Sequence, residues 1–150
     1  MFGLKSRKRR VTVDTGLIVA AVIYGSAKSR ELIDTVKAKD ELVMTNIILL
    51  QCTRQGRKKK CPISEREIER RVREMCPDVV YIELIPLEQL KERYSMRDDS
   101  DLEVLYSADM TDSQIIIASD HDFHDPNNPV KGVKAKIMWP DEYLDWVKKR

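Results

Sequence analysis

The sequence has few of the residues that mark secreted, zinc-binding or membrane proteins. It contains three cysteines, none of them in a C-x-x-C pair, and two histidines, which favours reduced thiols over a disulfide framework or a zinc site. No stretch is apolar over the length of a membrane span, and no apolar core follows the basic amino terminus as it does in a secretory signal. We therefore expect a cytoplasmic protein that does not engage a membrane, with Cys52 as a small buried residue.

Charged residues, in contrast, are plentiful and separated by sign. They make up 35% of the chain, although the net charge is only +2. Basic residues concentrate at 5–10 and 54–60, whereas 97–125 contains eight aspartates. Neighbouring carboxylates raise one another's pKa unless a cation lies among them. This separation is consistent with a polyanion that is bound at the basic segments and processed at the acidic one, while two solvated loops are the alternative.

Hydrophobic periodicity predicts one α/β domain over 11–150, preceded by a flexible basic arm at 1–10. The predicted helices cover 16–24, 26–39, 47–54, 64–75, 87–94, about 99–108 and 141–149. Apolar and β-branched runs predict five strands, at 11–13, 41–45, 79–85, 113–118 and 133–138. Strands that alternate with helices indicate a mainly parallel sheet, in which ligands bind beyond the carboxyl ends of the strands.

Local signals predict how several of these helices begin. Asn46 is a candidate cap for the helix that follows the second strand, and Asp99 or Ser100 for the helix that begins near 100. Ser64 and Glu67 have the spacing of a capping box.

Aspartates follow two of the predicted strands and begin one of the helices. Asp14 ends the first strand, Asp120 follows the fourth, and Asp101 lies where a helix starts, so all three are expected at one edge of the sheet. Carboxylate oxygens without histidine or cysteine partners suit Mg²⁺ or Mn²⁺. Such an ion supports hydrolysis of a phosphodiester. Five basic residues would hold the nucleic-acid backbone: Arg54, Arg57, Lys58, Lys59 and Lys60.

Each of these side chains also has an ordinary structural interpretation. Asp14 would cap a strand end, Asp120 and Asp122 would form an Asx turn, and Asp112 would fix the turn before its strand. Asp98 and Asp99 are expected to cap a helix or to support the site indirectly. The two histidines, His121 and His124, are expected to be solvated, and the two tryptophans, Trp139 and Trp146, to lie in the core or at an interface.

In order and spacing, the motifs of this chain resemble those of the PIN domain family. They are VTVDTGLI at 11–18, TNIILLQ at 45–51, DDSD at 98–101, TDSQIIIASDHDF at 111–123 and GVKAKIMWPDEYL at 132–144, so that the resemblance covers about 11–149. The resemblance implies a three-layer α/β/α fold and a Mg²⁺- or Mn²⁺-dependent ribonuclease. It also implies an RNA substrate, a homodimer and, for the VapC-type toxins of the family, an antitoxin partner.

The same resemblance implies roles for individual residues. Asp14, Asp101 and Asp120 would be the metal ligands, Asp122 an outer partner, and Ser119 the small hydroxyl residue that helps to hold the site. Two positions depart from the family pattern. Gln51 stands where glutamate is usual, which predicts weaker metal binding and leaves open an RNA-binding or interaction module without catalysis. Gly16 stands where asparagine or serine is commoner, and it also argues against a HAD-type phosphatase, which needs a second aspartate there.

Overall fold

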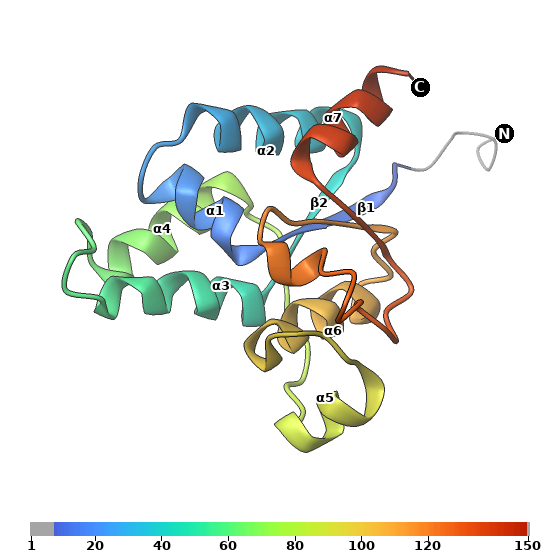
Figure 1. The fold of residues 1–150 in the computed structure, drawn as a ribbon. Helices are drawn as coiled ribbons and strands as arrows, with labels where there is room; N and C mark the ends of the chain where they lie inside the picture. Colours follow the sequence, from blue (N-terminus) through green and yellow to red (C-terminus); the bar gives the residue numbers. More distant parts are fainter. Residues whose placement is uncertain (1–7, 150) are drawn as a thin grey trace, which may run out of the picture.

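The computed structural model describes residues 8–149 (Figure 1). Most of the predicted basic arm, residues 1–7, therefore lies outside the described residues. The strands are β1 (Arg10–Val13), β2 (Glu41–Thr45), β3 (Val79–Val80), β4 (Ile115–Ile117) and β5 (Lys136–Met138). The α helices are α1 (Thr15–Val22), α2 (Ala27–Lys39), α3 (Asn46–Arg54), α4 (Glu65–Met75), α5 (Leu87–Arg93), α6 (Leu102–Met110) and α7 (Pro140–Lys148). Short 3-10 turns include η2 (Gln55–Arg57), η3 (Asp99–Asp101) and η4 (His121–Phe123).

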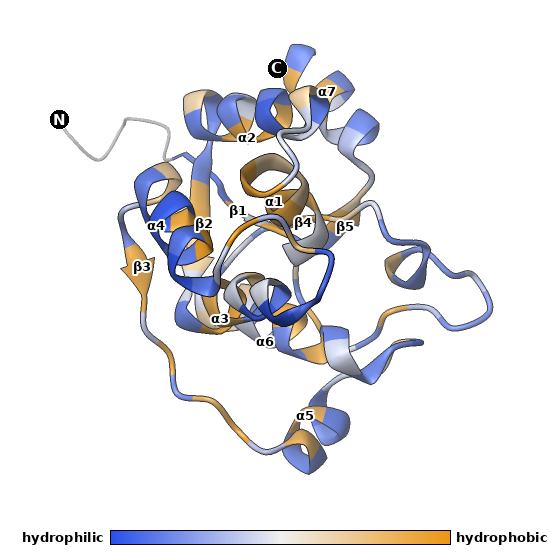
Figure 2. Cartoon of the chain, turned by 90° about the vertical axis from the view of Figure 1, so that its left-hand side faces the viewer, coloured by the Kyte–Doolittle hydropathy of each residue, from blue (hydrophilic) through white to orange (hydrophobic). Residues whose placement is uncertain are grey.

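The sheet confirms the predicted α/β class. Its order is β3-β2-β1-β4-β5, and every neighbouring pair is parallel. Helices cover both faces, which gives the three-layer α/β/α arrangement (Figures 1 and 2). Because side chains alternate along a strand, Ile115 and Ile117 of β4 pack with α1, α2, α4 and α7, whereas Ile116 packs with α6. All three isoleucines are buried, as expected of a strand covered on both faces.

The third strand is much shorter than predicted. Only Val79 and Val80 pair with β2, opposite Met44 and Thr45. Strand β2 ends at Thr45, where the chain enters α3, so residues 81–85 have no neighbouring strand to pair with. The side chain of Asn46 takes over instead, since its Oδ1 accepts from Ile82 N at 2.8 Å and its Nδ2 donates to Ile82 O at 3.1 Å. Asn46 is therefore not the helix cap, and Thr45 caps α3 by accepting from Ile48 N.

Three other predicted boundaries are also wrong. The fourth strand begins at Ile115, because Ser113 still belongs to the turn after α6, where its amide donates to the carbonyl of Ala108 at 2.8 Å. The hydroxyl of Ser113 lies 2.7 Å from Thr12 Oγ1. The fifth strand begins only at Lys136, where it pairs with Ile115. Asp98, rather than Asp99 or Ser100, is the capping residue before α6, and it accepts from Ser100 N at 3.0 Å.

The described end of the basic arm belongs to the fold. Arg10 opens β1, pairs with Glu41 at 3.6 Å and donates to the carbonyl of Thr111 at 3.0 Å. The guanidinium of Arg9 lies over the ring of Trp146, 4.7 Å from its centre. These contacts lie at the amino end of β1, whereas Asp14 follows its carboxyl end.

Two remaining expectations concern burial and the membrane. Cys52 is fully buried in the core beneath α3, as predicted, and burial raises the pKa of its thiol. Among the described residues, no helix has the length and apolar character needed to cross a membrane.

Candidate functional site

A cleft of about 820 Å³ opens at the carboxyl edge of the sheet. This is the edge at which parallel sheets usually bind ligands. Carboxylates from three parts of the fold line it: Asp14 after β1, Asp99, Asp101 and Glu103 at the start of α6, and Asp120 after β4. The opposite wall is apolar and comes from the extended segment after β3 and from α5, with Leu84, Ile85, Pro86, Leu87 and Leu90.

Asp14 is held at the bottom of this cleft by the backbone. Its amide donates to the carbonyl of Ile117 on β4 at 2.9 Å, and its own carbonyl accepts from Leu17 N as α1 begins. The residue is only 5% exposed. Burial raises the pKa of Asp14 to about 6 and the charge of Asp120 adds to that rise, while the backbone amides of Thr15 and Gly16 oppose it. No lysine or arginine among the described residues forms an ion pair with Asp14.

Asp101, at the start of α6, also has a raised pKa. Burial raises its pKa to about 7, and the negative charges of Asp14, Asp98, Asp120 and Asp122 add to the rise. Its Oδ2 is buried and has no hydrogen-bond partner among the described residues. Burying a carboxylate oxygen without a hydrogen-bond donor costs free energy, because the hydrogen bonds that water made to it are not replaced.

A second group of carboxylates adjoins the cleft. Oxygens of Asp98, Asp101 and Asp122 lie within 4.8 Å of one another. Asp122 also lies 3.5 Å from Nε of Arg97, and Asp120 accepts from Asp122 N at 2.9 Å as it caps η4. Asp98 was expected to act only as a cap or an indirect support, yet it lies within reach of an ion bound to Asp101. Ser119 is exposed beside Asp120.

The other aspartates of 97–125 have structural partners. Asp99 pairs with Lys91 at 3.1 Å, and Asp109 accepts from the hydroxyl of Tyr94 at 2.6 Å. Asp125 accepts from Asn127 N at 2.9 Å. Asp112 lies in the turn before β4 with a φ of 54°, which agrees with its expected role. Asp99, Asp109 and Asp125 are therefore held by structural partners, whereas Asp101 is not.

Gln51 lies in the cleft, but both ends of its amide are engaged. Its Oε1 accepts from the hydroxyl of Thr15, and its Nε2 donates to Glu103 Oε1 at 3.1 Å. Glu103 is the residue that sequence reasoning missed. The available signal was its place in the first turn of a helix that begins at the carboxyl edge of the sheet, two residues after Asp101.

Gly16 has room for a side chain. A Cβ built there would lie 3.5 Å from Asp14 Oδ2, which is an ordinary contact. The departure from the family pattern at this position is therefore not forced by sterics.

The basic residues expected to hold nucleic acid are separated by the structure. Arg54 lines the cleft and is the one cation among its lining residues. Arg57 is paired with Glu65 at 2.8 Å. Lys58, Lys59 and Lys60 are exposed in the turn after η2.

His124 was expected to be solvated, but it is half-buried and packed. Its ring stacks on Trp139, with centres 3.6 Å apart and planes 11° apart, and its Nε2 lies 2.8 Å from the carbonyl of Ala118. His121 is exposed and meets Trp139 edge-on. Because these contacts join β4, η4 and the end of β5, they fix the loop that carries Asp120 and Asp122.

The donors of the site fit a hard divalent cation. They are carboxylate oxygens, which Mg²⁺ and Mn²⁺ prefer. The buried, unpartnered Oδ2 of Asp101 and the uncompensated charge of Asp14 are the features that a bound cation would satisfy. The structure contains Asp14, Asp101 and Asp120 in one cleft, and Asp98 and Asp122 beside Asp101.

Comparison with known proteins supports the fold, but it identifies no family for this chain. No protein-family model matches the chain, and no curated protein matches it. Among solved structures, a chain from the crystal structure of VapBC2 from Rickettsia felis bound to a DNA fragment from their promoter is similar, with a TM-score of 0.58 and 9% identity. The match covers 87% of this chain and 98% of that one. At this identity the likeness concerns the fold alone.

Proposed function

We propose that this protein is a metal-dependent endoribonuclease whose active site is the acidic cleft at the carboxyl edge of the sheet. The observation that carries the proposal is that Asp14, Asp101 and Asp120 line one cleft in which the buried Oδ2 of Asp101 has no hydrogen-bond partner among the described residues. The raised pKa values of Asp14 and Asp101, about 6 and 7, agree with it. Perturbed acids of this kind gather at functional sites. The fold shared with a chain of a VapBC2 complex supports the same assignment.

Asp14, Asp101 and Asp120 would hold Mg²⁺ or Mn²⁺, with Asp122 as an outer partner. A bound ion of this kind supplies a water of lowered pKa and stabilises the leaving oxygen of a phosphodiester. Arg54, the cation of the cleft lining, would bind the phosphate of the RNA. The apolar wall around Leu84 and Leu87 would contact the sugars and bases of the RNA.

The test is RNA cleavage in Mn²⁺ and in EDTA, with single-stranded and structured RNA. We expect cleavage only with metal, and a loss of at least about 100-fold in D14N and in D101N, the range that follows from removing a charged group of an active site. D112N is the matched control, because Asp112 belongs to the same acidic stretch but lies in the turn at the opposite end of β4. Equal cleavage by D14N and the wild type would contradict the proposal.

One observation favours a second candidate, an RNA-binding or interaction module without catalysis. Gln51 brings no carboxylate to the cleft, and Thr15 and Glu103 already engage both ends of its amide. Binding of RNA in EDTA together with no cleavage in Mn²⁺ would establish this candidate and reject the nuclease.

An antitoxin-like protein and a second copy of the chain are the proposed partners. The structural neighbour, which was crystallised as a VapBC2 complex, supports the first of these partners. Purification from the native cells with a tag on this chain should recover a small partner in stoichiometric amount, and light scattering should give twice the mass of one chain. A monodisperse monomer would reject the dimer.

A further inference from the structure

The amide of Gln51 holds the side chain of Glu103, which comes from another helix. Thr15 donates to Gln51 Oε1, and the nitrogen of the same amide lies 3.1 Å from Glu103 Oε1. The amide nitrogen also lies 3.5 Å from the carbonyl of Ser100, next to Asp101. The side chain of Gln51 therefore bridges the start of α1 and the start of α6, on either side of the cleft.

Glu103 lies in the cleft and has a carboxylate oxygen available to a ligand. It is half-buried and lines the same cleft as Asp14, Asp101 and Asp120. Among the described residues no lysine or arginine pairs with it, and the amide of Gln51 is the donor that reaches its Oε1. Its second oxygen, Oε2, has no hydrogen bond to a described residue. The carboxylate is thus fixed by one oxygen and available through the other.

An independent observation is that two acids of this cleft have no cationic partner, although Arg54 is among the lining residues. Asp14, which lines it at 5% exposure, has no cationic partner among the described residues, and the buried Oδ2 of Asp101 has no donor. Glu103 adds a fifth carboxylate to a lining that already holds Asp14, Asp99, Asp101 and Asp120. This accumulation of negative charge is tolerable where a cation binds.

We propose that Glu103 is an additional ligand of the divalent-cation site and that Gln51 is the residue that positions it. The inference rests on the proposed nuclease site and deepens it. A glutamate at 51 would place two carboxylates about 3 Å apart, a distance at which like charges cannot both ionise easily. A glutamine at 51 removes this repulsion and donates a hydrogen bond, so the carboxylate that α3 lacks is supplied by α6.

The experiment measures Mn²⁺ binding by calorimetry, without RNA, in four proteins. They are the wild type, E103Q, Q51E and the exchanged double variant Q51E/E103Q. We expect E103Q to bind Mn²⁺ at least tenfold more weakly, Q51E to gain nothing because its new charge faces Glu103, and the double variant to return to within about threefold of the wild type. The exchange keeps the net charge and the hydrogen bond between the two side chains while moving the acid from one helix to the other.

E31Q is the matched control, because Glu31 is an exposed acid on α2, away from the cleft. The melting temperature in EDTA verifies that each variant folds. Mn²⁺ binding by E103Q within twofold of the wild type would overturn the role of Glu103. A gain in affinity in Q51E, or no recovery in the folded double variant, would overturn the pairing with Gln51.

These outcomes are separate from those of the proposed function. If the wild type and E103Q bind Mn²⁺ equally and the wild type cleaves RNA, the inference fails and the nuclease stands. If the wild type binds Mn²⁺ through Glu103 and cleaves no RNA, the inference stands and the nuclease fails.

Discussion

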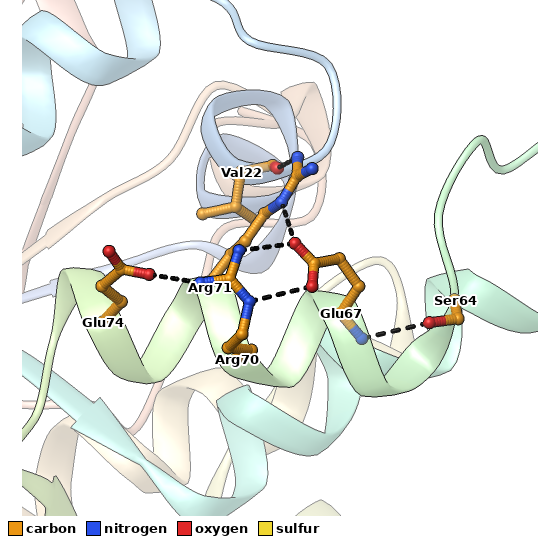
Figure 3. Close-up of polar contacts among 6 residues, drawn as sticks. All are labelled: Val22, Ser64, Glu67, Arg70, Arg71 and Glu74. Carbon is orange, nitrogen blue, oxygen red and sulfur yellow. Dashed lines mark hydrogen bonds and ion pairs between the residues drawn. The ribbon is translucent and has the colours of Figure 1, made fainter.

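Glu67 on α4 and Asp101 at the start of α6 carry the same functional group, and their surroundings move its pKa in opposite directions. Hydrogen bonds from Arg70 and Arg71, at 2.6 and 2.9 Å, lower the pKa of Glu67 to about 2 (Figure 3). Burial and the charges of neighbouring aspartates raise that of Asp101 to about 7. Helix α4 supplies the cations for its own acids, whereas the cleft does not.

The difference follows from sequence spacing. On α4, Glu67, Glu69 and Glu74 each lie three or four residues from an arginine with which they pair on the helix surface. Arg71 also donates to the carbonyl of Val22 at 2.8 Å (Figure 3). The acids of the cleft come from three strand and helix ends, and among the described residues neither Asp14 nor Asp101 forms an ion pair with a base. The contrast supports the proposal that a cation binds at the cleft.

The largest expected effect is a stabilisation of the metal-free protein by D14N. The pKa of Asp14 rises from 3.8 to about 6 on folding, which corresponds to a cost of up to about 3 kcal/mol for the charged form at neutral pH. Neutral asparagine avoids this cost, so chemical denaturation in EDTA at pH 7 should show a higher free energy of unfolding. D34N on α2 is the control, and an unchanged or lower stability of D14N would break the comparison.

The same shift predicts a pH dependence of comparable size. Between pH 4 and pH 6, folded Asp14 holds more protons than the unfolded chain does, so stability falls as pH rises through this window. Asp101 extends the fall to about pH 7. Melting temperatures in EDTA should therefore decrease from pH 4.5 to pH 7.5, and the decrease should be smaller in the D14N/D101N variant. Identical profiles would show that neither group is perturbed.

RNA binding should distinguish exposed lysines from the arginine that is already paired. Replacing Lys58, Lys59 and Lys60 with alanine should weaken binding about tenfold in EDTA and lower the slope of log affinity against log salt by about 2, since each phosphate contact to a single strand contributes about 0.7. R57A should have less effect, because Glu65 already occupies this guanidinium at 2.8 Å. An unchanged slope in the triple variant would place the RNA elsewhere.

Helix α4 should respond to the loss of its cap. Ser64 Oγ accepts from Glu67 N at 3.1 Å (Figure 3), and S64A should cost about 1 kcal/mol of stability. S64D, which keeps an acceptor at this position, should restore most of the loss. Equal stability of S64A and the wild type would show that the first turn of α4 does not need the cap.

The smallest effect is expected from E67Q, with a sign opposite to that of D14N. Exposed ion pairs contribute little and are screened by salt. We expect the melting temperature to fall by about one or two degrees at low salt and by less in 1 M NaCl. A rise in melting temperature would remove the contrast between the two regions.

The sequence was sufficient to predict the layers of the fold and the convergence of three aspartates. Asp14, Asp101 and Asp120 follow or begin regular elements, and the geometry of a parallel sheet brings such positions to one edge. The short third strand could not be predicted, because 81–85 has the composition of a strand but lost its partner where β2 turned into α3. Asn46 replaced that partner through a side chain, which no periodicity reveals.

The finer arrangement of the site was also beyond sequence reasoning. Glu103 could be recognised only once α3 and α6 were known to lie side by side, since 52 positions separate it from Gln51. The stacking of His124 on Trp139 likewise joins segments that are distant in the chain. Asp98 has the sequence pattern of a cap and is one, and its approach to Asp122 depends on how the loop after β4 folds back.

The cleft is proposed to bind a divalent cation whose positive charge balances the carboxylates of Asp14 and Asp101. Calorimetric titration of Mn²⁺ into the wild type and D101N at pH 7, in two buffers of different ionisation enthalpy, tests it most directly. We predict saturable binding by the wild type with release of protons, because a carboxyl group with a pKa of about 7 must ionise to bind the ion, and binding at least tenfold weaker in D101N. No binding by the wild type, or equal binding by D101N, would contradict the claim.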